Sequence, residues 1–211
     1  MLTAEKVYSV LEKKYPRAEI ALTHKNPLEL LISVILSAQC TDKRVNIVTK
    51  KLFKKYRKAE DYAYGDLDKL KEMIRSTGFY NAKAKNIQNA CKIIVEKYHG
   101  KVPSTMKELI SLPGVARKTA NIVLSNAFGK IEGIAVDTHV KRISYRLGLT
   151  KNTNPVKIEQ DLIKVLSKNK WNHFTYLIIE HGRAICKAPI PICSECVFNK
   201  ECPKVGVIKS K

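Results

Sequence analysis

Four cysteines near the end of the sequence have a spacing suited to metal binding. They fall within 17 residues, in the pattern Cys-x6-Cys-x2-Cys-x5-Cys, at Cys186, Cys193, Cys196 and Cys202. Four thiolates can hold a tetrahedral zinc ion or an iron–sulfur cluster. Structural zinc sites usually combine two short Cys-x-x-Cys pairs, and only one such pair is present here. The spacing by itself therefore favours an iron–sulfur cluster slightly and leaves zinc open.

A second stretch, Leu112–Leu124, is typical of a helix, a hairpin turn and a second helix. Pro113 and Gly114 predict the tight turn, with glycine where the backbone approaches a neighbour closely. The start of the second helix offers backbone N–H groups and the positive end of the helix dipole to an anion. Arg117 and Lys118 lie in that same first turn, where the dipole disfavours cations. This conflict indicates either a functional site or an ordinary turn with two solvated basic residues.

The composition indicates a globular protein with a polyanionic partner. Hydrophobic residues make up 45% of the 211 residues, and 39 Lys+Arg against 19 Asp+Glu give a net charge of +20. This excess favours nucleic acid over an acidic membrane. A lysine-rich codon bias or a heat-adapted surface explains the lysines, but explains the shortage of acids less well. Eight of the basic residues lie in the segment 43–58, interleaved with apolar residues, which favours a solvated helix face over a phosphate-binding patch.

The sequence has the features of an intracellular protein. No apolar run reaches the roughly 18 residues that a membrane span needs, and the N-terminus lacks a signal-peptide core. We therefore expect a cytoplasmic protein, whose cysteines serve metal or cluster chemistry rather than disulfides. Cys40 and Cys91 lie in apolar helical segments and are expected to be buried thiols.

Helical periodicity without sustained two-residue alternation predicts an all-α fold. Helix N-caps are expected at Thr3, at Thr41 or Asp42, at Asp66 and at Asp137, and Thr105 with Glu108 forms a capping box. The expected helices cover approximately residues 3–14, 28–38, 43–58, 66–75, 82–98, 105–111, 115–127, 138–147, 155–166 and 171–184.

Four short motifs accompany the cysteine pattern. They are Leu-Ser-Ala-Gln-Cys-Thr-Asp at 36–42, Gly-Phe-Tyr-Asn at 78–81, Leu-Pro-Gly-Val-Ala-Arg-Lys-Thr-Ala-Asn at 112–121 and Val-Asp-Thr-His at 136–139. Over nearly its whole length, the chain resembles the endonuclease III family of DNA glycosylase/AP lyases. The resemblance implies the helix-hairpin-helix glycosylase fold, with a DNA-binding cleft between two all-α lobes. One is a six-helix lobe of residues 22–130, and the other is a cluster lobe of residues 1–21 and 131–211.

The resemblance implies catalytic roles for two residues. Lys118 would displace the damaged base and form a Schiff base with the opened sugar, and β-elimination would then cut the strand 3′ to the abasic site. The helix start and Arg117 favour the neutral amine that this attack needs. Asp137 would face Lys118 across the cleft and stabilise the positive charge that develops on the sugar. The implied substrates are oxidised pyrimidines and abasic sites in double-stranded DNA.

The resemblance also implies DNA contacts and a cofactor. Gln39 would enter the space left by the extruded base, and Phe79, at a position where the family has leucine, would wedge into the duplex. Backbone N–H groups of Gly114 and Ala116 would hold a phosphate. The further expected contacts are Arg117, Lys83 and Lys187, and the expected ligands of a 4Fe-4S cluster are Cys186, Cys193, Cys196 and Cys202.

Lysine at position 118 helps to separate a bifunctional glycosylase/lyase from two alternative functions. The adenine and mismatch-thymine glycosylases of the superfamily lack it, so its presence favours a bifunctional glycosylase/lyase over a monofunctional mismatch glycosylase. A non-catalytic iron–sulfur DNA-binding module is the alternative from a different class, since it needs the hairpin and the cysteines but neither Lys118 nor Asp137. We expect the protein to act as a monomer.

Overall fold

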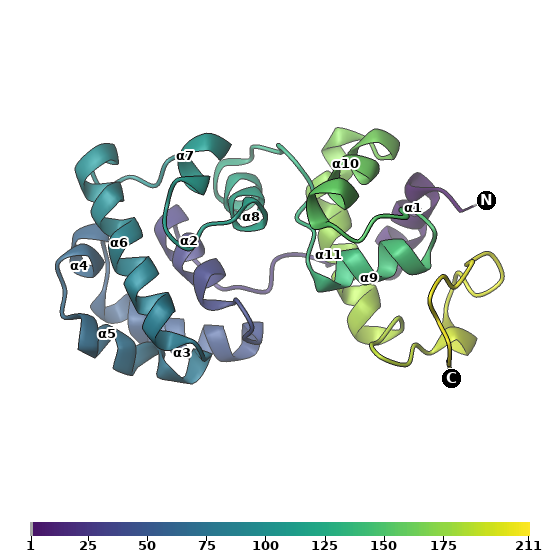
Figure 1. The fold of residues 1–211 in the computed structure, drawn as a ribbon, viewed down its shortest axis with the longest axis horizontal. Coiled ribbons are helices and arrows are strands. Elements are labelled where there is room, and N and C mark those ends of the chain that lie inside the picture. Colours follow the sequence, from purple (N-terminus) through teal and green to yellow (C-terminus); the bar gives the residue numbers. More distant parts are fainter. Residues whose placement is uncertain (1) are drawn as a thin grey trace. The chain divides into compact units, whose positions relative to one another are not determined.

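The computed structural model describes residues 2–211, which form helices and loops and no β-strand (Figure 1). The all-α prediction is therefore confirmed. The chain divides into two compact units: unit 2 is the continuous segment Ile20–Glu132, and unit 1 combines the chain up to Glu19 with Gly133–Lys211. No helix of the described residues is long and apolar enough to cross a membrane.

The described part of unit 2 forms seven α-helices, where the sequence predicted six. The additional helix, α4, has five residues and is too short to show a helical repeat. Asp61 holds its start, because Oδ2 accepts hydrogen bonds from the N–H groups of Arg57 (2.7 Å) and Lys58 (3.0 Å). The elements are α2 (Pro27–Leu36), α3 (Asp42–Lys55), α4 (Ala59–Ala63), α5 (Leu67–Ile74), the 3₁₀-helix η1 (Arg75–Thr77), α6 (Tyr80–Tyr98), α7 (Met106–Ile110) and α8 (Arg117–Phe128).

Two helices supply much of the apolar core of unit 2. Helix α2 is buried on nearly all sides and packs against α8, α3 and α6. Helix α6 packs against α4 and α5 and buries Ile87 and Ile94 completely. Burying one large aliphatic side chain stabilises a fold by about 1.5–3 kcal/mol. This core therefore fixes the loop that follows α2 and the loop that precedes α6.

Unit 1 joins the first helix to the last third of the chain. Helix α1 packs against α11 and α10, with Val7 and Leu11 fully buried. An ion pair also joins α1 to the C-terminal loop, since Lys6 Nζ lies 2.6 Å from Glu201 Oε2. The elements are α1 (Ala4–Lys14), α9 (Thr138–Arg146), α10 (Pro155–Val165), the 3₁₀-helix η2 (Lys168–Lys170), α11 (Trp171–Ala184) and the 3₁₀-helix η3 (Cys193–Glu195).

The predicted N-caps are confirmed. Each accepts a hydrogen bond from a backbone N–H group in the first turn of its helix, and Thr41 rather than Asp42 is the cap of α3. The capping box before α7 is only partly formed, because the Glu108 carboxylate accepts from the Thr105 hydroxyl (2.6 Å). The capping residues are Thr3, Thr41, Asp66, Thr105 and Asp137.

Candidate active site and cysteine pocket

The hairpin is a tight turn between α7 and α8. The Val115 N–H donates to Leu112 O at 3.1 Å, and Gly114 has a φ of 78°, which L side chains rarely adopt. A Cβ on Gly114 would lie 3.0 Å from Asn86 Cβ on α6. Both the turn and the close approach of α6 therefore require glycine at this position, as the sequence predicted.

Positive charge gathers at the start of α8. Ala116 is the N-cap, and its methyl group cannot accept a hydrogen bond from the first turn. Arg117 and Lys118 occupy that turn with exposed side chains. The helix dipole, the N–H groups of the first turn and two cations thus all favour an anion beside Gly114 and Ala116.

Gln39 and Phe79 share an unusual backbone conformation. Their φ angles are 53° and 49°, in the left-handed region that costs a non-glycine residue roughly 1–2 kcal/mol. Both side chains are exposed, Phe79 at 65% of its full area. Residues in strained backbone conformations cluster at functional sites. The loop after α2 and the loop before α6 therefore each present one such residue to solvent.

The structure contradicts the phosphate contact expected for Lys83. Its side chain is buried, and Nζ donates to Leu36 O and Thr77 O, each at 2.8 Å. Burial lowers the pKa of Lys83, so the two carbonyl acceptors are needed to stabilise its charged form. The ammonium is thereby held by protein carbonyls instead of facing DNA.

Cys40 also differs from expectation, since it is half-buried rather than buried.

Asp137 lies immediately before α9 and caps that helix. Its Oδ1 accepts a hydrogen bond from the Val140 N–H at 2.8 Å, and the residue is half-buried. Lys118 belongs to unit 2 and Asp137 to unit 1. Each residue is positioned by a helix start in its own unit, and their action as a pair stays a prediction.

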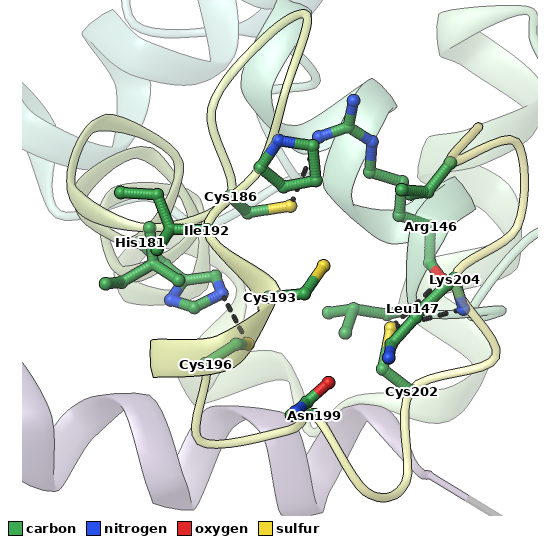
Figure 2. A pocket seen from close by; sticks show the side chains of 13 residues that line it. Arg146, Leu147, His181, Cys186, Ile192, Cys193, Cys196, Asn199, Cys202 and Lys204 are labelled. Carbon is green, nitrogen blue, oxygen red and sulfur yellow. Dashed lines mark hydrogen bonds between the residues drawn. The ribbon is translucent and has the colours of Figure 1, made fainter. Parts of the chain in front are cut away.

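The four cysteines of the C-terminal pattern line one pocket (Figure 2). All four are free thiols, and the open space among the lining residues is about 360 Å³. Across residues 2–211, no three His, Cys, Asp or Glu side chains gather closely enough to hold one metal ion. The four thiols of this pocket are the donors that a metal group bound there would use.

Hydrogen-bonding groups lie close to three of the four sulfur atoms. Arg146 Nη1 lies 3.5 Å from Cys186 Sγ, and the Lys204 N–H donates to Cys202 Sγ at 3.3 Å. His181 Nε2 lies 3.7 Å from Cys196 Sγ. Burial, followed by the charge of Lys14, lowers the pKa of His181 to about 4, so its ring is neutral at pH 7.

Burial also acts on the thiols themselves. It raises the pKa of Cys196 and of Cys202, and the neighbouring cysteines add to the effect. Thiolates in this pocket therefore need compensating positive charge, which a metal centre supplies.

Two arginines that hold the cysteine loop were missed by the sequence analysis. Arg142 Nη2 donates to Cys186 O at 3.0 Å, and Arg146 donates to Lys187 O (2.8 Å) and Pro189 O (3.1 Å). The two arginines are four residues apart, so they lie on one face of α9. The four-residue spacing of the arginines was visible in the sequence, but their contact with the cysteine loop was not. The Lys187 side chain is exposed, and its phosphate contact stays a prediction.

The comparisons with known proteins agree with this architecture. Residues 32–168 match the family model of the HhH-GPD superfamily base excision DNA repair proteins, so the fold and the hairpin define a protein of base excision repair. The chain is 54% identical over 200 residues to Endonuclease III of Synechocystis sp., covering 95% of this chain and 91% of that protein. The chain belongs to the endonuclease III family and is a DNA glycosylase/AP lyase of base excision repair.

Two solved structures are similar over almost the whole chain. A non-covalent Endonuclease III–DNA complex has a TM-score of 0.92, and a trapped Endonuclease III–DNA covalent intermediate has a TM-score of 0.91. Each is 46% identical in sequence and covers 97% of both chains. The predicted family and fold are therefore confirmed.

Proposed function

We propose that this enzyme removes oxidised pyrimidines from double-stranded DNA and cuts the strand 3′ to the resulting abasic site. The observation that carries the proposal is the exposed Lys118 amine in the first turn of α8, beside the Gly114 turn. A DNA phosphate at this helix start would bring the sugar of an extruded nucleotide close to the amine.

Lys118 is the nucleophile in this proposal. Its neutral amine attacks C1′ of the sugar, the bond from C1′ to the base breaks, and the base leaves after gaining a proton. The lysine nitrogen then loses one proton, the bond from C1′ to the ring oxygen breaks as that oxygen gains a proton, and a protonated imine joins the nitrogen to C1′. Loss of a C2′ proton expels the 3′ phosphate by β-elimination. Water finally hydrolyses the imine and releases Lys118.

Asp137 is the carboxylate partner in this reaction. It stabilises the positive charge that develops on the sugar as the base departs, and it takes part in proton movement. The hydrogen bond from the Val140 N–H to Asp137 Oδ1 supports this role, because it restricts the orientation of the carboxylate.

Gln39 and Phe79 are proposed to hold the duplex open. Gln39 fills the space of the extruded base, and the Phe79 ring enters between neighbouring base pairs and unstacks them. Their exposure and their left-handed backbone conformations support these roles.

The pocket is proposed to bind a 4Fe-4S cluster. Four free thiols around one pocket fit such a group, and N–H donors close to the sulfurs stabilise bound thiolates. When bound, the cluster supplies thiolate–iron bonds that close a loop with little core of its own. The ligands would be Cys186, Cys193, Cys196 and Cys202.

The proposed partner is duplex DNA with a damaged pyrimidine or an abasic site, bound by a single copy of the chain. The net charge of +20 supports this partner, as does the similarity to two solved DNA complexes. The helix start with Lys118 and the Gln39 and Phe79 loops all belong to unit 2 of one chain, which supports action as a monomer. We place this activity in the cytoplasm, where cysteines stay reduced.

Borohydride trapping tests the proposal. Wild type, Lys118→Ala and Lys107→Ala are incubated with duplexes that carry thymine glycol or an abasic site. Lys107 is the matched control, since it is an exposed lysine on α7 of the same hairpin. We expect a covalent adduct from wild type and Lys107→Ala, and none from Lys118→Ala.

The absence of an adduct from folded, cluster-loaded wild type on both duplexes would overturn the lyase mechanism. A monofunctional glycosylase would then still release the base, whereas a binding-only protein would leave it in place. An adduct from Lys118→Ala would assign the imine to another amine.

A further inference from the structure

The buried Lys83 ammonium connects two segments that are far apart in the sequence. Lys83 lies in the first turn of α6 and is only 5% exposed. Its Nζ donates to Leu36 O and to Thr77 O, each at 2.8 Å. One side chain therefore joins the end of α2 to the end of η1.

Both acceptors are carbonyls at helix ends. Leu36 is the last residue of α2, and Thr77 is the last residue of η1. In a continuing α-helix, the Cys40 N–H would donate to Leu36 O. It donates to Ser37 O instead, so this backbone N–H leaves Leu36 O to another donor. Carbonyls at helix C-termini lack partners within the helix and attract cations. The ammonium thus satisfies two such carbonyls at once.

The two carbonyls lie within three residues of the two strained residues. Gln39 is three residues after Leu36, and Phe79 is two residues after Thr77. Of the described non-glycine residues, four have a positive φ, and Gln39 and Phe79 are two of these. The lysine therefore holds both loops at the point where each leaves its helix.

We propose that Lys83 is a positioning residue that sets the separation of Gln39 and Phe79, so that both enter the duplex at the same lesion. This inference rests on the DNA-opening roles proposed for those two residues. Its effect should appear in the selectivity for a lesion, because general attraction to DNA comes from the exposed cations.

A structural role alone predicts a different result. If Lys83 only stabilised the fold, its replacement would lower the fraction of folded protein and reduce binding to every duplex equally. The ratio of two affinities measured on one preparation cancels the folded fraction. That ratio therefore separates positioning from stability.

The experiment compares wild type, Lys83→Met, Lys83→Gln and the control Lys97→Met. Methionine matches the length of lysine without its donors, while glutamine is shorter and keeps an amide donor. Lys97 is an exposed lysine in the last turn of the same helix. The probes are two duplexes of one sequence, one intact and one with a tetrahydrofuran abasic analogue opposite 2-aminopurine.

We expect Lys83→Met to reduce the affinity ratio of abasic over intact duplex by about tenfold, which is the scale of one lost charge-assisted hydrogen bond. Its 2-aminopurine fluorescence at saturation should also be lower than that of wild type, since Phe79 no longer unstacks the opposite base. Lys83→Gln should fall between the two, and Lys97→Met should match wild type. Should Lys83→Met fail to fold, Lys83→Gln carries the same comparison.

An unchanged ratio and unchanged fluorescence in folded Lys83 variants would overturn the inference and leave the proposed function intact. Equal affinity of wild type for both duplexes would overturn the proposed function, and this inference with it.

Discussion

The two units hold their irregular segments in place by different means. In unit 2, the loops with Gln39 and Phe79 emerge from helices that share a broad apolar core, and a buried lysine joins them. In unit 1, the segment 186–211 has the three-residue η3 as its regular structure. Arginine–carbonyl bonds hold that segment instead, and the four thiols lie within it. Hydrophobic burial thus supports the first region, whereas the second depends on polar contacts and on the metal group proposed for its pocket.

The largest expected effect comes from removing one cluster ligand. Cys202→Ser should abolish cluster loading, and residues 186–211 should lose protection from hydrogen exchange, because their backbone has little other support. Unit 2 should keep its protection. Iron content, visible absorbance and hydrogen exchange by mass spectrometry measure the three parts of this prediction.

The matched control is Cys91→Ala, which changes a buried cysteine of unit 2. It should cost about 1 kcal/mol of stability, as small core truncations do, and leave the iron content at the wild-type level. Equal loss of protection in both units of Cys202→Ser would contradict the independence of the two regions.

An intermediate effect is expected at Phe79, where two substitutions measure the backbone strain that unit 2 imposes on one of its loops. Glycine adopts positive φ without strain, whereas alanine does not. Phe79→Gly should therefore be more stable than Phe79→Ala by roughly 1 kcal/mol, although both lose selectivity for the abasic duplex. Urea unfolding and duplex binding give the two readouts. Equal stability of the two variants would argue against strain at this residue.

The smallest effect is expected at Glu5, in the polar contacts of unit 1. The hydrogen bond from Lys170, and then those from Ser167, lower the pKa of Glu5 from 4.5 to about 2. The carboxylate therefore stabilises unit 1 above about pH 4.5, and this contribution is lost as the pH falls through 2. Because Glu5 is partly exposed to solvent, Glu5→Gln should cost less than about 1 kcal/mol at pH 7. Melting curves of wild type and Glu5→Gln at both ends of this pH range test the prediction. A stability difference between the two proteins that did not shrink in acid would contradict it.

Local signals predicted most helices and their caps, because capping residues and apolar spacing act within a few residues. The short helix α4 was not predicted, since its five residues are too few to show a helical repeat. The left-handed conformations of Gln39 and Phe79 were not predicted either, because the surrounding fold imposes them.

The phosphate contact predicted for Lys83 requires an exposed side chain, and the structure buries it. It continues the buried stripe of α6, with Ile87, Cys91 and Ile94 four, eight and eleven residues further on. That register was available in the sequence and indicated burial. The carbonyl partners of Lys83, like those of Arg142 and Arg146, lie on other elements, and only the fold brings them together.

The discontinuous composition of unit 1 has a consequence for synthesis of the chain. Unit 2 is one uninterrupted segment, so it can complete its core as soon as residue 132 has left the ribosome. Helix α1 emerges before unit 2, yet its apolar face is covered only when α10 and α11 follow. The four cysteines emerge after unit 2, so the cluster proposed for their pocket could bind only after the whole of unit 2 has been synthesised.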